Sequence, residues 1–277
     1  MMVALATQVF VDKAKHIMKV CVLGSGSKGN CTYVEYGSTR ILIDAGFSGK
    51  EIERRLAVID RSAVGLSAIF VTHEHNDHIA GVGVLSRRYG VPVFINNGTY
   101  QAAHRKLGKL TMLQSFTTGE VVTVNELQVH PFSVVHDAAD PVGFVIRTDN
   151  FCVGYCTDTG QVTRLINYHL RSCSTLILEA NHDPQMLRDG PYPVVLKQRI
   201  QSKNGHLANG EAVRFASSLA QGVLQHLVLA HISETNNHPD LVLSEAEKAF
   251  VGCRNVEVHL ARQDQPGPLL SVKQKEE

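Results

Sequence analysis

The sequence predicts a protein of the α/β (α+β) class, arranged as a four-layer αββα sandwich in which two sheets pack together between outer helices. Short, alternating runs of β-branched residues, bounded by Gly, Asn or Asp, dominate the first half of the chain. Strand pairs with short turns come early, and strand-helix units recur in both halves, which favours packed sheets with helices outside. Residue propensities alone do not select this sandwich over other mixed folds.

The individual elements are predicted from hydrophobic period and from their bounding residues. We expect strands at 19–23, 31–36, 39–44, 68–72, 92–95, 121–124, 127–134, 142–147 and 151–155, and later at 175–179, 227–230 and 256–260. We expect helices at 49–58, 77–89, 99–107, 194–201, 210–220 and 244–251.

The chain length of 277 residues allows one large domain or two small ones. No Pro/Gly-rich or repetitive stretch marks a linker, so we expect a single domain at residues 18–265. Residues 1–17 are expected to be an N-terminal extension, because the first strand-like segment begins at Met18, and residues 266–277 a C-terminal tail. The apolar stretch 3–11 has neither the basic segment nor the cleavage site of a signal peptide.

The overall charge identifies no partner. The chain has 27 basic and 26 acidic residues and a net charge of +1, so binding to nucleic acid or to an anionic membrane has to be argued from local features. The apolar runs are of strand length, and no membrane-spanning segment is expected.

The cysteines point to a reducing compartment. They form no CxxC pair, and several lie in apolar strand-like runs, as buried thiols do. The six are Cys21, Cys31, Cys152, Cys156, Cys173 and Cys253. We therefore expect a cytoplasmic protein.

Three histidines and one aspartate gather within six residues: His73, His75, Asp77 and His78. His73 and His75 are two residues apart in a chain leaving a strand, so their imidazoles project to the same side and can share one metal ion. Asp77 and His78 stand where a helix begins, within reach of a second ion. The alternative is a polar surface loop, which the strand before and the helix after the motif disfavour.

Three later apolar strands each end on a residue type that binds metals: His136, Asp158 and His231. Each residue alone is more often a capped strand end, but together with the first cluster they predict a two-metal site. Imidazole and carboxylate groups are ligands for Zn²⁺, Mn²⁺ or Fe, and a catalytic ion also needs an open position for water.

A glycine-rich loop offers a competing interpretation. Gly24, Gly26 and Gly29 come after an apolar strand with GxGxxG spacing, and Asp44 lies further on, as in a dinucleotide-binding protein. A true fingerprint opens a helix, whereas residues 31–36 alternate as a strand. The NAD-dependent oxidoreductase is therefore the less favoured alternative.

The same loop could bind a phosphate through its backbone N–H groups. The candidate phosphate-binding residues are Ser25, Ser27 and Asn30. A tight turn without any ligand explains the loop equally well, and Lys28 is either a solvated side chain or a phosphate contact.

With His73, His75, Asp77 and His78 as an HxHxDH signature, the sequence resembles the metallo-β-lactamase superfamily along most of its length. The resemblance implies the metallo-β-lactamase sandwich and two divalent metal ions, Zn²⁺ or Mn²⁺ rather than Fe. Asp44, which closes a strand, would be the aspartate of the family's first motif and would support the ligands rather than bind metal.

The resemblance also implies a division of the ligands between the two metals. The first metal would be held by His73, His75 and His136. The second would be held by Asp77, His78 and His231. Asp158 would bridge the two ions.

Further segments resemble the YycJ/WalJ-type branch of the superfamily over about residues 18–260. They are GSGSKGN at 24–30, HDA at 136–138, EANHD at 179–183, GHL at 205–207 and HIS at 231–233. Members of that branch are regarded as DNA exonucleases. The resemblance therefore implies a nucleic acid substrate, DNA before RNA.

Two cations a few ångströms apart would generate a metal-bridging hydroxide and neutralise charge on the attacked phosphoryl oxygens. The catalytic candidates are Asp77, His206 and His182, the two histidines as partners of the leaving oxygen. His206 is favoured, because ribonuclease Z-like relatives have a loop histidine in a similar place. For His182 a structural role is as good an account, since Asp183-Pro184 is typical of a helix start.

Two other classes of function remain open from the sequence. One is a small-molecule hydrolase acting on a cyclic phosphate, lactone or thioester with the same metals, which the near-neutral charge slightly favours. The other is an iron-dependent oxidoreductase. The branch-specific motifs oppose the first, and oxygen uptake with bound iron would mark the second.

Overall fold

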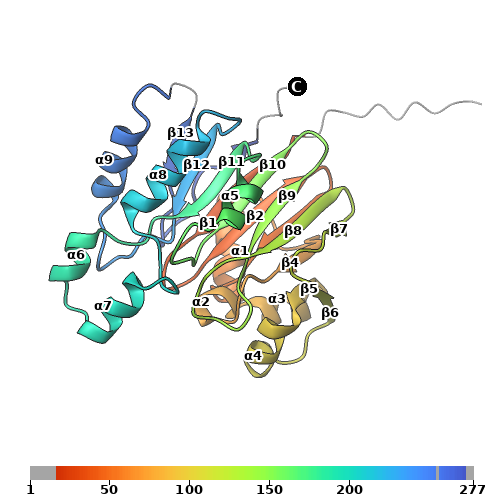
Figure 1. Ribbon diagram of the computed structural model, residues 1–277. Helices are drawn as coiled ribbons and strands as arrows, with labels where there is room; N and C mark the ends of the chain where they lie inside the picture. Colours follow the sequence, from red (N-terminus) through yellow and green to blue (C-terminus); the bar gives the residue numbers. More distant parts are fainter. Residues whose placement is uncertain (1–16, 254–255, 273–277) are drawn as a thin grey trace, which may run out of the picture.

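Two seven-stranded sheets lie face to face in the computed structural model, which describes residues 17–253 and 256–272 (Figure 1). The first sheet has the order β14-β1-β2-β3-β4-β5-β6, and the second has the order β13-β12-β11-β10-β9-β8-β7. Apart from β14, each sheet is therefore built from one half of the chain, so the space between the sheets is also where the two halves meet.

The strands of the first sheet are β1 (Lys19–Gly24), β2 (Cys31–Tyr36), β3 (Thr39–Ile43), β4 (Ala68–Phe70), β5 (Pro92–Asn96), β6 (Met112–Phe116) and β14 (Leu270–Ser271). Those of the second sheet are β7 (Val122–Val124), β8 (Leu127–Ser133), β9 (Val142–Arg147), β10 (Cys152–Cys156), β11 (Thr175–Glu179), β12 (His226–Ala230) and β13 (Glu257–Leu260). Strands β3 to β6 run parallel to one another, as do β10 to β13.

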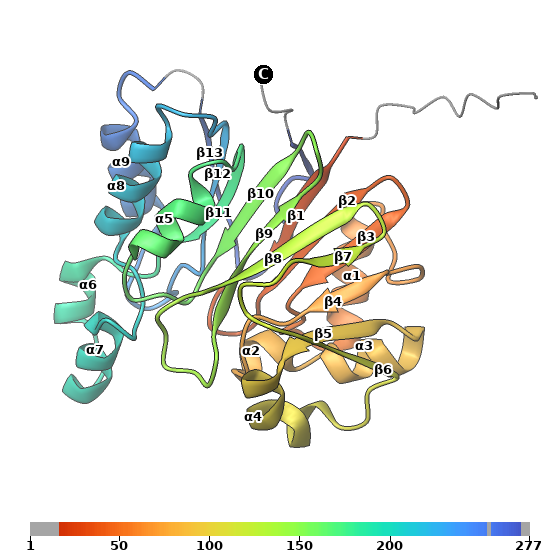
Figure 2. The same ribbon diagram turned by 45° about the vertical axis from the view of Figure 1, so that its right-hand side comes forward.

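Helices cover the outer face of each sheet (Figure 2). The first sheet packs against α1 (Gly49–Val58), α3 (Val82–Tyr89) and α4 (Asn97–Leu107), with the short α2 (Asn76–Ile79) at its edge. The second packs against α5 (Arg164–Leu170), α8 (Asn209–Leu219) and α9 (Pro239–Ala249). The remaining helices, α6 (Pro184–Asp189) and α7 (Val194–Gln201), form an arm beside the sandwich.

Alternation along the strands creates the layers, because successive side chains point to opposite faces of a sheet. In β12, Leu227 and Leu229 belong to the helix-covered outer core, whereas Val228 belongs to the core between the sheets. The inner core is closed by aromatic rings: Phe70 stacks on Phe94 at 4.7 Å, and Phe144 from the other sheet meets Phe70 edge-on at 5.7 Å.

The predicted four-layer αββα sandwich is confirmed, and most elements lie within a few residues of their expected positions. The helix expected at 77–89 is two helices, because Gly81 at the N-terminus of α3 lies against the backbone of Phe47 and Ala45. The last helix begins at Pro239, earlier than the expected 244, and His238 caps it. Three short elements, β6, α5 and β14, were not predicted, and of α6 only the start was expected.

The expected C-terminal tail contributes to the fold. Leu270 and Ser271 form β14, which pairs antiparallel with Val20 and Lys19 of β1, and Val272 is buried. A short strand of this kind covers the edge of a sheet that would otherwise expose unpaired backbone groups. Residues 273–277 and residues 1–16 of the expected N-terminal extension lie outside the described residues.

Among the described residues, no helix combines the length and the apolar character needed to cross a bilayer.

Replacing Phe144 with Ala should lower the free energy of unfolding by about 3–5 kcal/mol, because the ring is fully buried between the sheets and leaves a cavity. Urea denaturation measures the loss. Val195→Ala, at an exposed position of α7, is the control and should change stability by less than about 0.5 kcal/mol. A loss below about 1 kcal/mol for Phe144→Ala would contradict the position of this ring.

Candidate metal centre

The HxHxDH segment leaves the carboxyl end of β4 and brings two imidazoles together. His73 Nε2 lies 3.0 Å from His75 Nδ1, and the two ring centroids are 4.5 Å apart. Thr72 precedes them, and its hydroxyl lies 2.9 Å from His73 Nδ1, so that His73 Nε2 is the nitrogen turned toward His75. The two rings therefore converge as their spacing in an extended chain predicted.

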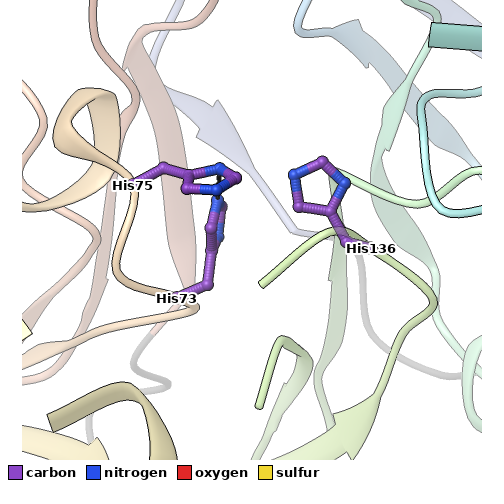
Figure 3. A group of neighbouring side chains, drawn as sticks. All are labelled: His73, His75 and His136. Atoms are coloured by element: carbon purple, nitrogen blue, oxygen red, sulfur yellow. Dashed lines mark hydrogen bonds between the residues drawn. The ribbon is translucent and has the colours of Figure 1, made fainter. Parts of the chain in front are cut away.

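His136 reaches the same place from the second sheet. Its ring lies 5.2 Å from that of His73 and 5.1 Å from that of His75, and Figure 3 shows it opposite them. His136 Nδ1 lies 3.1 Å from the carbonyl oxygen of Gly205, whereas Nε2 is buried and has no hydrogen-bond partner among the described residues. The three histidines form a group whose ligand atoms lie within 4.8 Å of one another.

Asp158 lies between this histidine group and a second one. Its Oδ1 is 3.8 Å from His136 Nε2 and 3.0 Å from His231 Nδ1. Its Oδ2 is 3.4 Å from His78 Nε2 and has no hydrogen-bond partner among the described residues. The carboxylate is thus placed to face two ions at once.

Asp77, His78 and His231 make up the second group. Asp77 Oδ2 is 3.5 Å from His78 Nε2 and 3.9 Å from His231 Nε2. His78 comes from α2 and His231 from the end of β12, so ligands from both halves of the chain meet here. All seven side chains expected to bind metal are therefore gathered at one end of the sandwich.

Asp44 contacts His78 on the ring nitrogen that faces away from Asp77 and Asp158. It accepts hydrogen bonds from the backbone N–H and the hydroxyl of Thr72, at 2.8 and 2.9 Å, and its Oδ2 lies 2.7 Å from His78 Nδ1. A carboxylate on one ring nitrogen fixes the orientation of the imidazole and leaves the other nitrogen for a metal. Asp44 itself is fully buried, and its contact with the ring nitrogen of His78 fits the supporting role that the resemblance implies.

Three of these residues have left-handed backbone conformations at or just beyond the ends of strands. Asp44 comes after β3 with φ 59°, Asp158 after β10 with φ 57°, and His231 after β12 with φ 53°. Non-glycine residues seldom adopt this conformation, and where they do the surrounding structure has to enforce it. Each turn of the backbone directs its side chain into the seam between the sheets.

Glu179, the last residue of β11, belongs to the same cluster, and the sequence interpretation gave it no role. Its Oε1 lies 2.7 Å from His206 Nδ1 and 3.1 Å from His231 Nδ1. Its Oε2 accepts hydrogen bonds from the backbone N–H groups of Thr159 and Leu207. The signal available in the sequence was its position, because Glu179 ends an apolar strand as Asp158 and His231 do.

The cluster concentrates charge in a buried space. Burial lowers the pKa of His73 far below its usual value, and burial also lowers the pKa of His136. Burial acts in the same direction on His78, but the carboxylates of Asp158, Asp44 and Asp77 outweigh it and hold the pKa of His78 well above its usual value. In the same way, Asp158 and Glu179 raise the pKa of His231 to about 10 against the effect of burial.

A cavity of about 240 Å³ opens over the cluster. His75, Asp77, His136, Asp158 and His231 lie on its wall together with His206, Tyr192 and Arg199. Arg199 belongs to α7 in the arm, and Tyr192 belongs to the loop before α7. A substrate in this cavity would therefore touch both the cluster and the arm.

The two candidate proton donors are placed differently. His206 lines the cavity, and its ring lies 5.0 Å from that of His136 and 5.2 Å from that of His231. His182 does not line this cavity but a neighbouring one, whose wall it shares with His206, and burial lowers the pKa of His182 to about 4. Asp183 caps α6, which confirms the helix start expected there. The backbone of His182 forms an isolated β-bridge with that of Ala208.

The three candidate phosphate-binding residues of the glycine-rich loop have different surroundings. Ser25 Oγ donates to Asn30 Oδ1 at 2.8 Å and accepts from the backbone N–H of His231 at 2.9 Å. Asn30 Nδ2 lies 3.2 Å from Asp77 Oδ2 and 3.1 Å from His78 Nε2. Ser25 and Asn30 are buried and engaged by protein groups, so they position the cluster, and of the three candidates only Ser27 lines the cavity.

The strand after this loop excludes the dinucleotide-binding alternative. The chain continues from Asn30 directly into β2, which pairs antiparallel with both β1 and β3. A dinucleotide fingerprint requires a helix at this point. Lys28 extends to the surface and pairs with Glu234 at 2.6 Å.

The donor set fits divalent metal ions. Imidazole nitrogens and carboxylate oxygens suit Zn²⁺, Mn²⁺ and Fe, and the groups His73/His75/His136 and His73/His78/Asp158 have the compactness that one ion requires. The buried His136 Nε2 and Asp158 Oδ2, which lack partners among the described residues, are the atoms a metal would engage. Buried polar atoms without partners call for such an explanation.

Two mixed sheets face to face, with histidines and carboxylates gathered at one end of the strands, define a protein of the metallo-β-lactamase fold. A model of the β-lactamase superfamily domain matches residues 39–232. The exodeoxyribonuclease YycJ of Bacillus anthracis is 36% identical over 245 residues, covering 86% of this chain and 93% of its own. The exodeoxyribonuclease WalJ of Streptococcus pneumoniae strain D39 is 38% identical over 227 residues, or 80% and 84% of the two chains.

Among solved structures, the metallo-β-lactamase fold protein YhfI from Bacillus subtilis superimposes with a TM-score of 0.70 at 20% identity, covering 91% of this chain and 99% of its own. This likeness concerns the fold alone. The chain belongs to the metallo-β-lactamase superfamily and, within it, to the YycJ/WalJ-type branch.

Metal affinity should fall as the pH is lowered. Neighbouring carboxylates raise the pKa of His78 and that of His231, so protons compete with a metal ion for both rings, and each proton has to leave before its nitrogen binds a metal. The dissociation constant should rise by about tenfold per pH unit for each proton displaced. Competition with a chelator at pH 6.5, 7.5 and 8.5 measures this dependence, and a constant affinity across that range would refute it.

Proposed function

We propose that this protein is a dinuclear-metal-dependent phosphodiester hydrolase and that its substrate is DNA, which it degrades as an exonuclease. The observation that carries the proposal is the position of Asp158 between two groups of imidazoles, 3.8 Å from His136 Nε2 and 3.4 Å from His78 Nε2. The relatives named as exodeoxyribonucleases, which align over most of the chain, support the choice of substrate.

In this proposal each group of side chains holds one ion. His73, His75 and His136 would hold the first metal. Asp77, His78 and His231 would hold the second. Asp158 would contribute to both, and Asp44 supports His78 through its hydrogen bond. We propose Zn²⁺ or Mn²⁺, since this mixture of imidazole and carboxylate suits both.

Two bound cations would supply a water-derived hydroxide near neutral pH and would neutralise charge on the phosphoryl oxygens. The remaining tasks fall to the protein. Glu179 holds His206 through Nδ1 at 2.7 Å, so any proton that His206 gives up comes from Nε2. We propose that His206 donates this proton to the leaving oxygen of the substrate, which otherwise departs as an unstable alkoxide.

The cavity wall supports a nucleic acid substrate. Arg199 lies in the wall and is half-exposed, with its Nε 2.8 Å from Asp137 Oδ2. A guanidinium at this place can pair with a phosphate, and the ring of Tyr192 in the same wall offers a surface on which a base can stack. His182 has no part in this scheme, because it does not line the cavity over the cluster and burial lowers its pKa to about 4.

We also propose that the protein acts in the cytoplasm. Cys21, Cys31 and Cys156 are buried thiols, which suits a reducing compartment. A DNA substrate would be found in the same compartment.

Asp158→Ala should lower the metal content by at least one ion per chain and reduce turnover by at least about 10²-fold. Loss of a mere supporting partner of a metal ligand already costs about 10–100-fold, and Asp158 faces both groups directly. Elemental analysis and cleavage of bis-p-nitrophenyl phosphate measure the two effects. Asp240→Ala, at an exposed position in the first turn of α9, is the matched control. Full activity in Asp158→Ala would reject the assignment.

His206→Ala should separate two kinds of substrate. On DNA, whose leaving group needs a proton, kcat should fall by about 10²–10⁴-fold. On bis-p-nitrophenyl phosphate the leaving phenolate is stable, so the loss should stay within about tenfold, with unchanged metal content. His206→Gln keeps a donor for Glu179 and supplies no proton, so it should be as slow on DNA as His206→Ala. Equal losses on both substrates would show that His206 acts by positioning alone.

End-labelled duplex DNA, single-stranded RNA and a panel of lactones and thioesters, each offered with Zn²⁺ and with Mn²⁺, test the substrate class. Release of mononucleotides from DNA ends supports the proposal. Cleavage of small esters without any attack on DNA would replace it with the small-molecule hydrolase. Duplexes blocked at the 5′ or the 3′ end then give the polarity.

A further inference from the structure

A second group of side chains able to bind a metal lies away from the candidate metal centre. His226 is the first residue of β12, and Glu257 and His259 lie on the neighbouring strand β13. Ligand atoms of the three residues lie within 4.8 Å of one another. His231 lies beyond the other end of β12, and five residues of extended chain separate the two groups by about 16 Å.

The pairing of the strands places the three side chains on one face of the sheet. In the parallel register, His226 is opposite Glu257 and Val228 is opposite His259. Side chains two residues apart on a strand share a face, and so do residues opposite each other. Val228 belongs to the core between the sheets, so this face is the inner one, near the edge of the sandwich. The regular pairing of β12 with β13 therefore sets the relative positions of the three residues, and no loop is involved.

The distances suit a shared ion. Glu257 Oε2 lies 3.5 Å from His226 Nδ1 and 3.9 Å from His259 Nε2. Two ligands on a tetrahedral zinc ion, with bonds of about 2.0–2.1 Å, are separated by about 3.4 Å. Both distances need to shorten by no more than about 0.5 Å to meet this geometry.

Burial gives independent support. His259 Nε2 is buried and has no hydrogen-bond partner among the described residues. A buried polar atom without a partner is uncommon in folded proteins, and an ion bound at that place is one of the standard explanations. His226 is buried as well, whereas Glu257 is mostly exposed, so an ion could enter from the side of Glu257.

We propose that His226, Glu257 and His259 bind one divalent metal ion, with Zn²⁺ the best match to two imidazoles and a carboxylate. The ion links β13, the edge strand of the second sheet, to β12, and it leaves one coordination position for water. This site is independent of the metals assigned to the catalytic cluster, because it uses none of the same side chains.

Zinc titration of the metal-stripped protein tests the proposal. His259→Ala should bind one ion fewer than the wild-type chain, as counted by equilibrium dialysis and elemental analysis. His104→Ala removes an exposed histidine of α4 and should bind as many ions as the wild type. The result is a difference between variants, so it does not depend on how many ions the catalytic cluster holds. Equal zinc content in His259→Ala and wild type would overturn the proposal.

Glu257→Gln provides a second variant that should fold normally, because the side chain is mostly exposed. It replaces a charged ligand by a neutral amide, and the zinc-dependent rise in Tm should be smaller by roughly 5 °C than in the wild type. A crystal soaked in zinc and measured at the zinc absorption edge should show an anomalous peak among the three side chains. No peak there, with peaks present at the catalytic cluster, would equally overturn the proposal.

Discussion

The compensation of buried charge at one end of the sandwich is the constraint on which the rest of the structure depends. Asp158 and Glu179 are buried, and the carboxylates that face His78 and His231 hold the pKa of each ring above its usual value. Removing charges from water is costly unless they are paired and hydrogen-bonded. The strand ends, the hydrogen bond between the buried side chains of Ser25 and Asn30, and the contact of Asp44 with His78 all help to hold these opposite charges together.

The fold was largely predictable, because most of its strands are either alternately or continuously apolar. Both patterns can be recognised in the sequence. The unpredicted elements lack that signal. β6 is mostly exposed, and four of its five residues face solvent, so it shows no apolar alternation. β14 is two residues long and owes its existence to the backbone groups of β1. The break between α2 and α3 depends on how closely Gly81 approaches Phe47, a tertiary contact.

The site was predictable where ligand residues stand close together in the sequence or end an apolar strand. Glu179 satisfied the second condition and opens the EANHD segment at 179–183, but neither feature indicated which groups its carboxylate contacts. Its importance comes from His206 and His231, which lie 27 and 52 residues further along. The pairing of β11 with β12 brings His231 to it, whereas His206 comes from the loop before α8. The polar atoms of Ser25 and Asn30 are likewise engaged by residues distant in the chain, which sequence patterns do not reveal.

The arm formed by α6 and α7 packs less closely against the rest of the protein than the strands that carry the cluster do. None of the eight residues of α7 is buried, yet Leu196, Arg199 and Ile200 form one wall of the cavity. Segments with so few buried contacts open at low free-energy cost and tolerate change. The residues suited to bind metal and the residues of this outer wall thus lie on different elements, so the wall can change in sequence while the cluster beneath it stays the same.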